Sequence, residues 1–402
     1  MKVGIIKEGK VPEDKRVALT PAQCEEVLEK YPEVEIYVQK SPIRCYTDQE
    51  YQDAGIAVVD NVDDCDILLG IKEVPIPELV PNKKYFFFSH TIKKQPYNRE
   101  LLRAILNNNI DIVDYEVLVR EDGSRVIAFG RFAGLVGAYN GLLAYGKRHN
   151  IYDLKPAHQC HDLNELWIEC KKVKLPNDFK IVLTGSGRVS NGAVETLLAA
   201  GIKKVSKQDY LNETFDSPVF VQLRSKDYHE KKDGGAFEIK DFFANPSDYK
   251  STFGDFLPVS NMLVAGAFWH PAAPVLFTKE DTQREDFKIE VIADVTCDIE
   301  GSIPSTKRPS TIADPLYDYN PATGNDEEAF SSKDNITVMA VDNLPNELPR
   351  DASEAFGRQM IDNVLEDLFV TPIGVVKGAT ITHDKKLTEK FSYLQDYVDG
   401  KE

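Results

Sequence analysis

The sequence predicts an α/β protein made of two doubly wound domains with parallel sheets. Its 402 residues exceed the usual length of a single domain. Short apolar segments alternate with helical segments up to about residue 135, and the alternation resumes at residue 180. At 180–201 an apolar segment, a glycine-rich turn and a helix follow one another, as at the opening of a βαβ unit. These observations favour strands joined by crossover helices, which makes the sheets parallel.

The first domain is expected to begin with a strand at 1–6 (MKVGII) and a helix that starts at Pro21. Thr20 is a good N-cap, and proline suits the first helical position because its missing N–H would be unpaired there anyway. Further strands are expected at 34–39, 65–72, 84–90 and 110–116, with helices at 48–55 and 98–109.

The second half repeats the α/β pattern. Residues 132–148 are rich in glycine and alanine and apolar at helical spacing, which suits a helix packed closely between two domains. Later strands are expected at 217–224, 261–268 and 289–295, and 336–369 reads as a strand, a proline-containing turn and a long amphipathic helix. Because 320–335 has linker composition, we expect one domain of residues 1–135 plus 335–402 and another of 136–334.

Composition and charge narrow the class of protein. The formal net charge of −17 disfavours nucleic acid and anionic membranes as partners, so small molecules are the expected ligands. The N-terminus lacks the apolar core of a signal peptide, and no apolar run approaches the length of a membrane helix, which favours a cytoplasmic protein. Six cysteines without a CxxC pair indicate reduced thiols. A monomer or a small homo-oligomer is expected.

The stretch TGSGRVSNGA (184–193) matches a dinucleotide-binding turn except at its third glycine, which is Ser190. Gly185 would allow the tight turn, and Gly187 would let the backbone approach a pyrophosphate. The helix that follows would offer its amide groups and its dipole to the phosphates. The expected cofactor contacts here are Gly185, Gly187, Arg188, Val189 and Ser190.

The type of nucleotide stays open in the sequence. Asp209 lies at the expected end of the second strand of this domain, near the roughly 20-residue spacing of an acid that binds the ribose of NAD. Lys207 stands beside it and could meet the 2′-phosphate of NADP. The sequence therefore predicts NAD(P)(H) without a choice between the two.

Polar residues also follow the expected strands of the first domain, where an open α/β sheet holds its ligands. Lys72 follows ILLGI and His90 follows YFFFS. Histidine titrates near neutral pH, and a lysine can do so when it is desolvated. Each residue alone is more often structural, and their shared position makes them candidates. The other residues of this group are Arg16, Lys93, Glu116 and Arg125.

Other site types are disfavoured. His158 and His161 flank Cys160, but a second pair at zinc-site spacing and a fourth ligand are missing, so no metal is expected. Neither a Gly-x-Ser-x-Gly elbow nor an HExxH motif occurs, which disfavours serine hydrolases and zincins.

The chain resembles the lysine-forming saccharopine dehydrogenases and the lysine-ketoglutarate reductase half of aminoadipic semialdehyde synthases, within the alanine dehydrogenase and transhydrogenase group. The matching stretches are KRVALTP (15–21), ILLGIKEVP (67–75), FFSHTIK (87–93), DYEVLVREDGSRVIAFGRFAG (114–134), TGSGRVSNGA (184–193), ADVTCDIEGSI (293–303) and VDNLPNELPRDASEAFG (341–357). The resemblance implies two Rossmann-like domains flanking a cleft, the first completed by the C-terminal segment. It also implies an NAD(P)-dependent oxidoreductase of CH-NH donors that interconverts saccharopine with L-lysine and 2-oxoglutarate.

By motif position, the resemblance implies Lys72 and His90 as the acid-base pair. It implies that Arg16 and Arg125 hold substrate carboxylates, that Lys93 and Glu116 shape the site, and that Asp342 lies near the cofactor and the substrate. Two alternatives remain: an alanine dehydrogenase-like or other amino-acid imine reductase, and a catalytically silent NAD(P)-binding protein.

Overall fold

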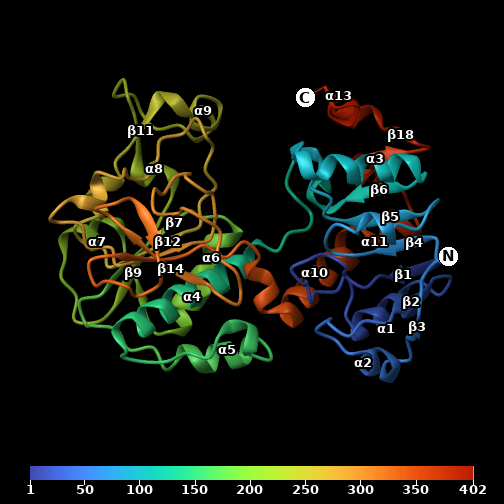
Figure 1. Ribbon diagram of the computed structural model, residues 1–402, viewed down its shortest axis with the longest axis horizontal. Coiled ribbons are helices and arrows are strands. Elements are labelled where there is room, and N and C mark those ends of the chain that lie inside the picture. The colour runs from blue at the N-terminus through green and yellow to red at the C-terminus, as the bar shows by residue number, and fades with distance from the viewer. Residues whose placement is uncertain (402) are drawn as a thin grey trace. The chain divides into compact units, whose positions relative to one another are not determined.

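The computed structural model describes residues 1–401 and divides them into two compact units (Figure 1). One unit contains residues 1–129 together with the C-terminal segment from Pro349, and the other contains Gly130–Leu348. Each unit holds one large, mainly parallel sheet with helices. The predicted α/β class is confirmed, and the C-terminal segment joins the first unit.

The sheet of the first unit has six parallel strands in the order β3-β2-β1-β4-β5-β6. The strands are β1 (Lys2–Ile5), β2 (Glu35–Gln39), β3 (Ala57–Val59), β4 (Ile67–Leu69), β5 (Lys84–Phe87) and β6 (Asp111–Asp114). The helices of the N-terminal part are α1 (Pro21–Lys30), α2 (Asp48–Asp53) and α3 (Arg99–Asn107). Helix α1 begins at Pro21 as predicted: Thr20 and Gln23 form a capping box, in which each side chain accepts a hydrogen bond from the other residue's backbone N–H.

This sheet is apolar on both faces, as parallel sheets are. One face packs Ile5 and Phe86 against Phe356 and Met360, which come from the C-terminal segment. The other face packs its side chains against α3 and against the chain end around Tyr397. The C-terminal segment therefore contributes to the core on both sides of the first sheet.

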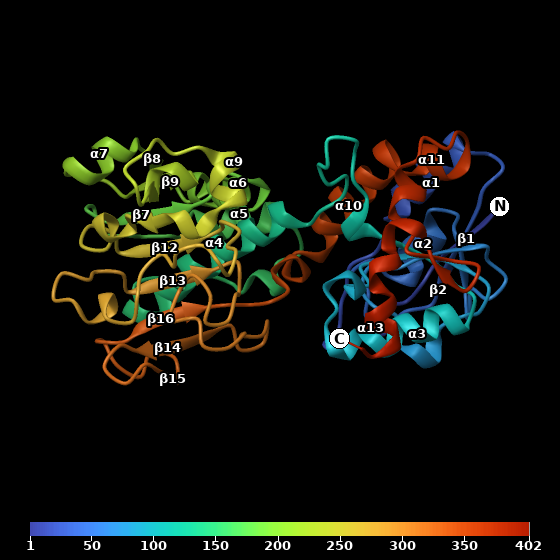
Figure 2. The same ribbon diagram turned by 90° about the horizontal axis from the view of Figure 1, so that it is seen from above.

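The C-terminal segment also supplies edge contacts. It forms α10 (Pro349–Asn363), α11 (Leu365–Phe369), α12 (Val375–Ala379), the short strands β17 (Thr382–His383) and β18 (Lys386–Leu387), and α13 (Gln395–Asp399). Figure 2 shows α13 beside α3, where Arg99 and Arg103 donate hydrogen bonds to the carbonyls of Tyr397 and Val398. These bonds secure the last helix to the N-terminal part of the chain.

The second unit has an eight-stranded sheet in the order β15-β14-β16-β13-β12-β7-β9-β8. Its strands are β7 (Lys180–Thr184), β8 (Lys203–Lys204), β9 (Val219–Leu223), β12 (Met262–Ala265), β13 (Val291–Asp294), β14 (Leu316–Asn320), β15 (Asn325–Glu327) and β16 (Ile336–Met339). A separate hairpin pairs β10 (His229–Lys231) with β11 (Tyr249–Ser251). The helices are α4 (Gly130–His149), α5 (Leu163–Cys170), α6 (Arg188–Ala199), α7 (Lys207–Asn212), α8 (Ser225–Tyr228) and α9 (Ile239–Ala244). Within residues 1–401, every helix falls short of the length and apolar character that crossing a membrane requires.

The linker expected at 320–335 is wrong. Asn320 ends β14, and the chain turns through Pro321 and Gly324 into β15, so the polar residues there belong to a β-hairpin. Strand β16 pairs with β13 and β14, which keeps it in the second unit beyond the expected boundary at 335. Turn-forming residues in a hairpin and in a linker have the same composition, and strand pairing distinguishes them.

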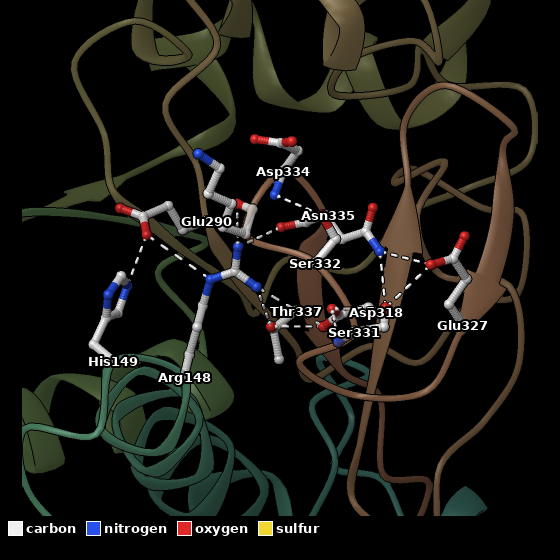
Figure 3. A network of polar contacts seen from close by, with 11 residues as sticks. Arg148, His149, Glu290, Asp318, Glu327, Ser331, Ser332, Asp334, Asn335 and Thr337 are labelled. Atoms are coloured by element: carbon white, nitrogen blue, oxygen red, sulfur yellow. Dashed lines mark hydrogen bonds and ion pairs between the residues drawn. The ribbon is translucent and has the colours of Figure 1, made fainter.

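A polar network secures the C-terminal end of α4 to this hairpin region (Figure 3). The guanidinium of Arg148 donates to Thr337 Oγ1 at 2.9 Å and to the carbonyl of Asn335 at 2.7 Å, and it lies 3.9 Å from the buried carboxylate of Asp318. His149 is paired with Glu290 at 2.7 Å. Because the protein itself supplies these partners, the network has the character of a structural anchor.

Candidate functional site

Four neighbouring strands of the first sheet bring charged side chains to one edge. Strands β1, β4, β5 and β6 are adjacent and parallel, so their carboxyl ends lie together. Glu8 follows β1, Lys72 follows β4, His90 follows β5 and Glu116 follows β6. The structure therefore gathers Lys72, His90 and Glu116 at the edge where open α/β sheets bind ligands.

His90 is held by a carboxylate. Its Nδ1 lies 2.6 Å from Glu73 Oε1, and Lys10 Nζ lies 2.6 Å from the other oxygen of the same carboxylate. Burial acts to raise the pKa of Glu73, but the hydrogen bonds from His90 and Lys10 outweigh it and lower that pKa to about 2. An ionised carboxylate only accepts hydrogen bonds, so Nδ1 carries the hydrogen and Nε2 is left to exchange a proton with a ligand.

The backbone at His90 is unusual. The residue adopts φ 53°, in the left-handed region that non-glycine residues seldom occupy. Its ring stacks on Phe88 with the planes 18° apart. Such conformations persist where the surroundings determine them, and here the contacts with Glu73 and Phe88 do so.

Lys72 lies in a buried, cation-rich environment. Burial lowers the pKa of its ammonium, and the nearby Arg16 and Lys10 lower it further, against the opposing effect of Asp14 and Glu73. A lysine with a lowered pKa has a larger fraction of neutral amine near neutral pH. Lys72 therefore has the environment of a proton-exchanging group.

Arg16 lies deeper than a surface substrate anchor would. It is 3% exposed, and its guanidinium donates two hydrogen bonds to the carboxylate of Asp14, at 2.9 and 2.5 Å. Its planar group also lies over the ring of Phe129, 4.2 Å from the centroid. The substrate-binding role expected for Arg16 stays a prediction, and in this arrangement Asp14 already takes two of its donors.

Glu8 is a member of this group that the sequence analysis missed. Its carboxylate accepts hydrogen bonds from the backbone amides of Ile71, at 2.7 Å, and Lys72, at 2.9 Å. Burial and the neighbouring Asp14 nevertheless raise its pKa to about 8. The only signal in the sequence was an acid shortly after the first strand, in KEGK. An exposed acid with no role in a site could equally well stand at this position. The same applies to Glu73, whose importance follows from its contact with His90.

Lys93 and Glu116 lie near each other, with Lys93 Nζ 3.4 Å from Glu116 Oε1. The other oxygen of Glu116 is buried and has no hydrogen-bond partner among residues 1–401. Asp114 holds this corner in place, since it accepts hydrogen bonds from the backbone amides of Ser89 and Glu116. An unpartnered buried carboxylate oxygen is suited to accept a hydrogen bond from a ligand.

Arg125 lies in the segment between β6 and α4, outside any helix or strand. It is exposed and pairs through its backbone with Val119 in a short antiparallel bridge. Its role in holding a substrate carboxylate stays a prediction.

Aromatic rings pack beside the charged residues around Lys72 and His90. The ring of Phe129 stacks on Phe356 with centroids 4.8 Å apart, and Phe88 and Tyr115 pack around the same pair. Phe356 comes from α10, so the C-terminal segment helps to exclude water from the region of Lys72 and His90. This packing explains the strong desolvation of the lysine and of Glu8.

The glycine turn of the second unit has the shape that a dinucleotide requires. Gly185 follows β7 at φ 97°, and a side chain there would collide with Ser190 Oγ. Gly187 caps α6, and a Cβ added to it would enter open space, so the backbone is accessible to a ligand. Arg188 and Val189 are the first two residues of α6, where amide groups face an anion.

Ser190 does more than fill the place of the third glycine. Its buried hydroxyl donates a hydrogen bond to the carbonyl of Thr184 at 2.9 Å, which ties the helix to the strand. The close approach needed in this region occurs elsewhere, between helices α4 and α6. A Cβ on Gly134 or Gly192 would overlap the backbone of the opposite helix. A glycine on each helix therefore lets α4 and α6 cross at short range.

Asp209 is not at a strand end, and this expectation is wrong. Strand β8 ends at Lys204, and Asp209 lies in the first turn of α7, where its amide and carboxylate both bond the hydroxyl of Ser206. Strand β8 is also an edge strand that pairs with β9, and β9 lies next to β7. Ser206 is the N-cap of α7, and Asp209 is bonded to this cap. The cofactor-binding role of Asp209 stays a prediction.

Asp342 is exposed just after β16, at the carboxyl edge of the second sheet. Its expected proximity to a cofactor stays a prediction. His158 lies 3.8 Å from Glu347, and the structure finds no group of three metal-ligating side chains among residues 1–401.

Comparisons with known proteins agree with this geometry. Residues 4–136 match the family described as alanine dehydrogenase/PNT, N-terminal domain. An alpha-aminoadipic semialdehyde synthase of Arabidopsis thaliana is 28% identical over 98% of this chain, which spans 41% of that protein. A lysine-forming, NAD(+) saccharopine dehydrogenase of Candida glabrata is 26% identical over 90% of this chain and 92% of its own length. The chain thus spans less than half the length of the synthase that it matches.

Solved structures show the same fold at low sequence identity. An L-alanine dehydrogenase covers 100% of this chain and 99% of its own, with a TM-score of 0.64 and 15% identity. A transhydrogenase from Sinorhizobium meliloti gives a TM-score of 0.61 at 14% identity, over 96% of this chain. The resemblance found in the sequence is confirmed: the N-terminal third of the chain matches the alanine dehydrogenase/PNT N-terminal domain, and about nine-tenths of the chain is similar to lysine-forming saccharopine dehydrogenases.

Proposed function

We propose that the chain is a lysine-forming saccharopine dehydrogenase, which reversibly condenses L-lysine with 2-oxoglutarate and reduces the product with NAD(P)H to saccharopine. The observation that carries this proposal is the pair formed by His90, with Nδ1 bound to Glu73, and the desolvated Lys72 at the same sheet edge. The similarity to saccharopine dehydrogenases over about nine-tenths of the chain supports the choice of substrate.

The reaction needs two proton-transfer groups. The lysine side-chain amine must lose a proton before it attacks the keto carbon, and the oxygen of the resulting adduct must gain protons to leave as water. The lowered pKa of Lys72 suits it to accept a proton, and His90 Nε2 can donate or accept one while Glu73 holds the ring. The nucleotide, when bound, supplies the hydride that reduces the imine.

Substrate carboxylates need cationic partners. Saccharopine carries three carboxylates, and the chain has a net charge of −17, so local cations must attract them. Lys93 and Arg125 are exposed enough to reach a ligand, and Glu116 offers its buried oxygen to an amine or a hydroxyl. Arg16 supplies a fixed positive charge beneath the surface of the protein, and it binds a substrate carboxylate if the substrate displaces Asp14.

The second unit would hold the nucleotide through the turn at Gly185 and Gly187 and the first turn of α6, with Asp342 at the same edge of its sheet. Both NADH and NADPH are compatible with a pyrophosphate at this turn.

The test is oxidation of NADH or NADPH by the purified chain with L-lysine plus 2-oxoglutarate. Oxidation that requires both substrates is expected, with saccharopine as the product identified by mass spectrometry. Oxidation only with pyruvate and ammonia would replace the proposal by an alanine dehydrogenase reaction, and nucleotide binding without turnover would indicate a silent binding protein.

A matched pair of variants tests the role of His90. His90→Asn is expected to lower kcat about 10²- to 10⁴-fold, the usual contribution of one acid-base group. His383→Asn is the control, because His383 also pairs through Nδ1 with a carboxylate, that of Asp111, but lies exposed on the C-terminal segment. Equal activity of the two variants would refute the assignment of His90.

A further inference from the structure

The strand order of the second unit places an unexpected residue beside the glycine turn. In a doubly wound domain, the acid or arginine that contacts the adenosine ribose lies at the end of the strand next to the one that leads into the glycine turn. Along the chain the next strand after β7 is β8, but in space β9 lies between them. The position that reads the ribose therefore falls at the end of β9, where Arg224 and Ser225 follow Leu223.

Arg224 is available for a ligand. The residue is exposed, and its guanidinium forms no ion pair with a carboxylate of residues 1–401. Its backbone N–H donates to the carboxylate of Asp227 at 2.7 Å, so the turn is held through the main chain. Lys207 reaches the same loop, with Nζ 2.5 Å from the carbonyl of Asp227, and adds a second positive charge.

An aromatic cavity opens over the same strand ends. Its volume is about 280 Å³, and its wall includes Thr184 at the end of β7, Ser225 after β9 and Ala265 at the end of β12. The rings that line it include those of Tyr228, His229, Phe242, Phe243, Phe268 and Trp269.

The cavity suits an uncharged, flat group. Burial lowers the pKa of His229 to about 4, so the imidazole is neutral near pH 7, and Nδ1 donates to the carbonyl of Ser225. Phe268 is 82% exposed, an unusual position for a phenyl ring unless a ligand covers it. A purine between aromatic side chains fits this lining, and its ribose would then lie toward Arg224.

We propose that Arg224 binds the 2′-phosphate of an NADP-type dinucleotide whose adenine occupies this aromatic cavity. The inference rests on the dinucleotide binding in the proposed function and goes beyond it by naming the nucleotide and the residue that selects it. An arginine can donate two parallel hydrogen bonds to a phosphate, and NAD offers only a hydroxyl at this position. Asp209, which lies in α7, has no part in the selection.

The test is binding of two mononucleotide fragments to the full chain, measured by titration calorimetry. One is 2′,5′-ADP, which carries the 2′-phosphate, and the other is 5′-ADP, which lacks it. Wild-type protein is expected to bind 2′,5′-ADP more tightly, and Arg224→Gln is expected to weaken that binding about 10- to 100-fold with little change for 5′-ADP. Lys203→Gln is the control, because it removes the same charge from β8, where Lys203 pairs with Val219 at the amino end of β9, whereas Arg224 follows the carboxyl end.

The outcomes separate this inference from the proposed function. Equal weakening of both fragments by Arg224→Gln, or no effect on either, overturns the role of Arg224 and leaves dinucleotide binding intact. Failure of the wild type to bind either fragment overturns both. Because Trp269 lines the cavity, a change in tryptophan fluorescence on binding of either fragment supports the position of the adenine.

Discussion

Replacing Glu73 with glutamine tests how the candidate site is held together. The carboxylate of Glu73 is 9% exposed and bonds His90 with one oxygen and Lys10 with the other. Glutamine keeps the shape of the side chain and removes its charge. The variant therefore isolates the electrostatic part of the arrangement.

The magnitude follows from the pKa of Glu73. That pKa falls from 4.5 to about 2 in the folded protein, where the hydrogen bonds overcome the opposing effect of burial. At about 1.4 kcal/mol per pH unit, ionised Glu73 stabilises the folded state by about 3 kcal/mol. A depressed carboxyl pKa gives stability that is fully present above the unfolded pKa and is lost as the pH falls toward the folded pKa. Glu73→Gln should thus cost up to about 3 kcal/mol at pH 7 and progressively less below pH 4.5.

Urea unfolding of both proteins at a series of pH values provides the assay. Circular dichroism follows both units, whereas the chain's two tryptophans, Trp167 and Trp269, lie in the second unit and report only on it. The variant should shift the circular dichroism transition and leave the fluorescence transition in place. Glu26→Gln, which breaks an exposed pair with Arg358 in the same unit, should cost no more than about 1 kcal/mol. A cost for Glu73→Gln that is the same at pH 7 and pH 4, or that grows as the pH falls, would refute the reasoning.

Three further changes have defined outcomes. Lys72→Arg should lower kcat/KM about 10²- to 10⁴-fold in steady-state assays, because a guanidinium does not release its proton. Activity near that of the wild type would exclude Lys72 from proton transfer. Arg148→Met should reduce the free energy of unfolding of the second unit by about 3–5 kcal/mol, because Asp318 would be left buried without its cation. Tryptophan fluorescence measures this change, and a loss below about 1 kcal/mol would contradict the expectation. Gly192→Ala should destabilise that unit by about 1–3 kcal/mol or more, since the added Cβ overlaps α4. Gly378→Ala is the control: its added Cβ enters open space, so this variant should be neutral or stabilising. Equal melting temperatures of the two variants would refute the close helix crossing.

Much of the candidate site could be predicted from local pattern. Lys72 and His90 each follow a short apolar strand, and parallel strands place such residues at one edge of the sheet. The glycine turn was recognisable for the same reason, because Gly185 and Gly187 lie between a strand and a helix. These are properties of neighbouring residues in the chain, and neighbouring residues determine periodicity and turns.

The partners of these residues could not be predicted in the same way. Glu73 is next to Lys72 in the sequence, but its role comes from a hydrogen bond to His90, which follows a different strand. Glu8 depends on the amides after β4, which a strand pairing brings to it. Burial then changes the pKa of Glu8 and of Lys72, and burial is a property of the packed molecule.

The sequence by itself determined the α/β class, the strands and helices with clear periodicity, the glycine turn and the candidate acid-base residues, because each is written in short-range spacing. Tertiary structure alone decided that β9 lies between β7 and β8 and that the expected linker contains the turn and second strand of a hairpin. It also decided that Asp209 lies in the first turn of α7, while Arg224 follows the strand next to the glycine turn. Strand order depends on which distant segments exchange backbone hydrogen bonds and bury each other's apolar faces. Strand order is therefore determined by the packing of the whole core, and a short stretch of sequence does not specify it.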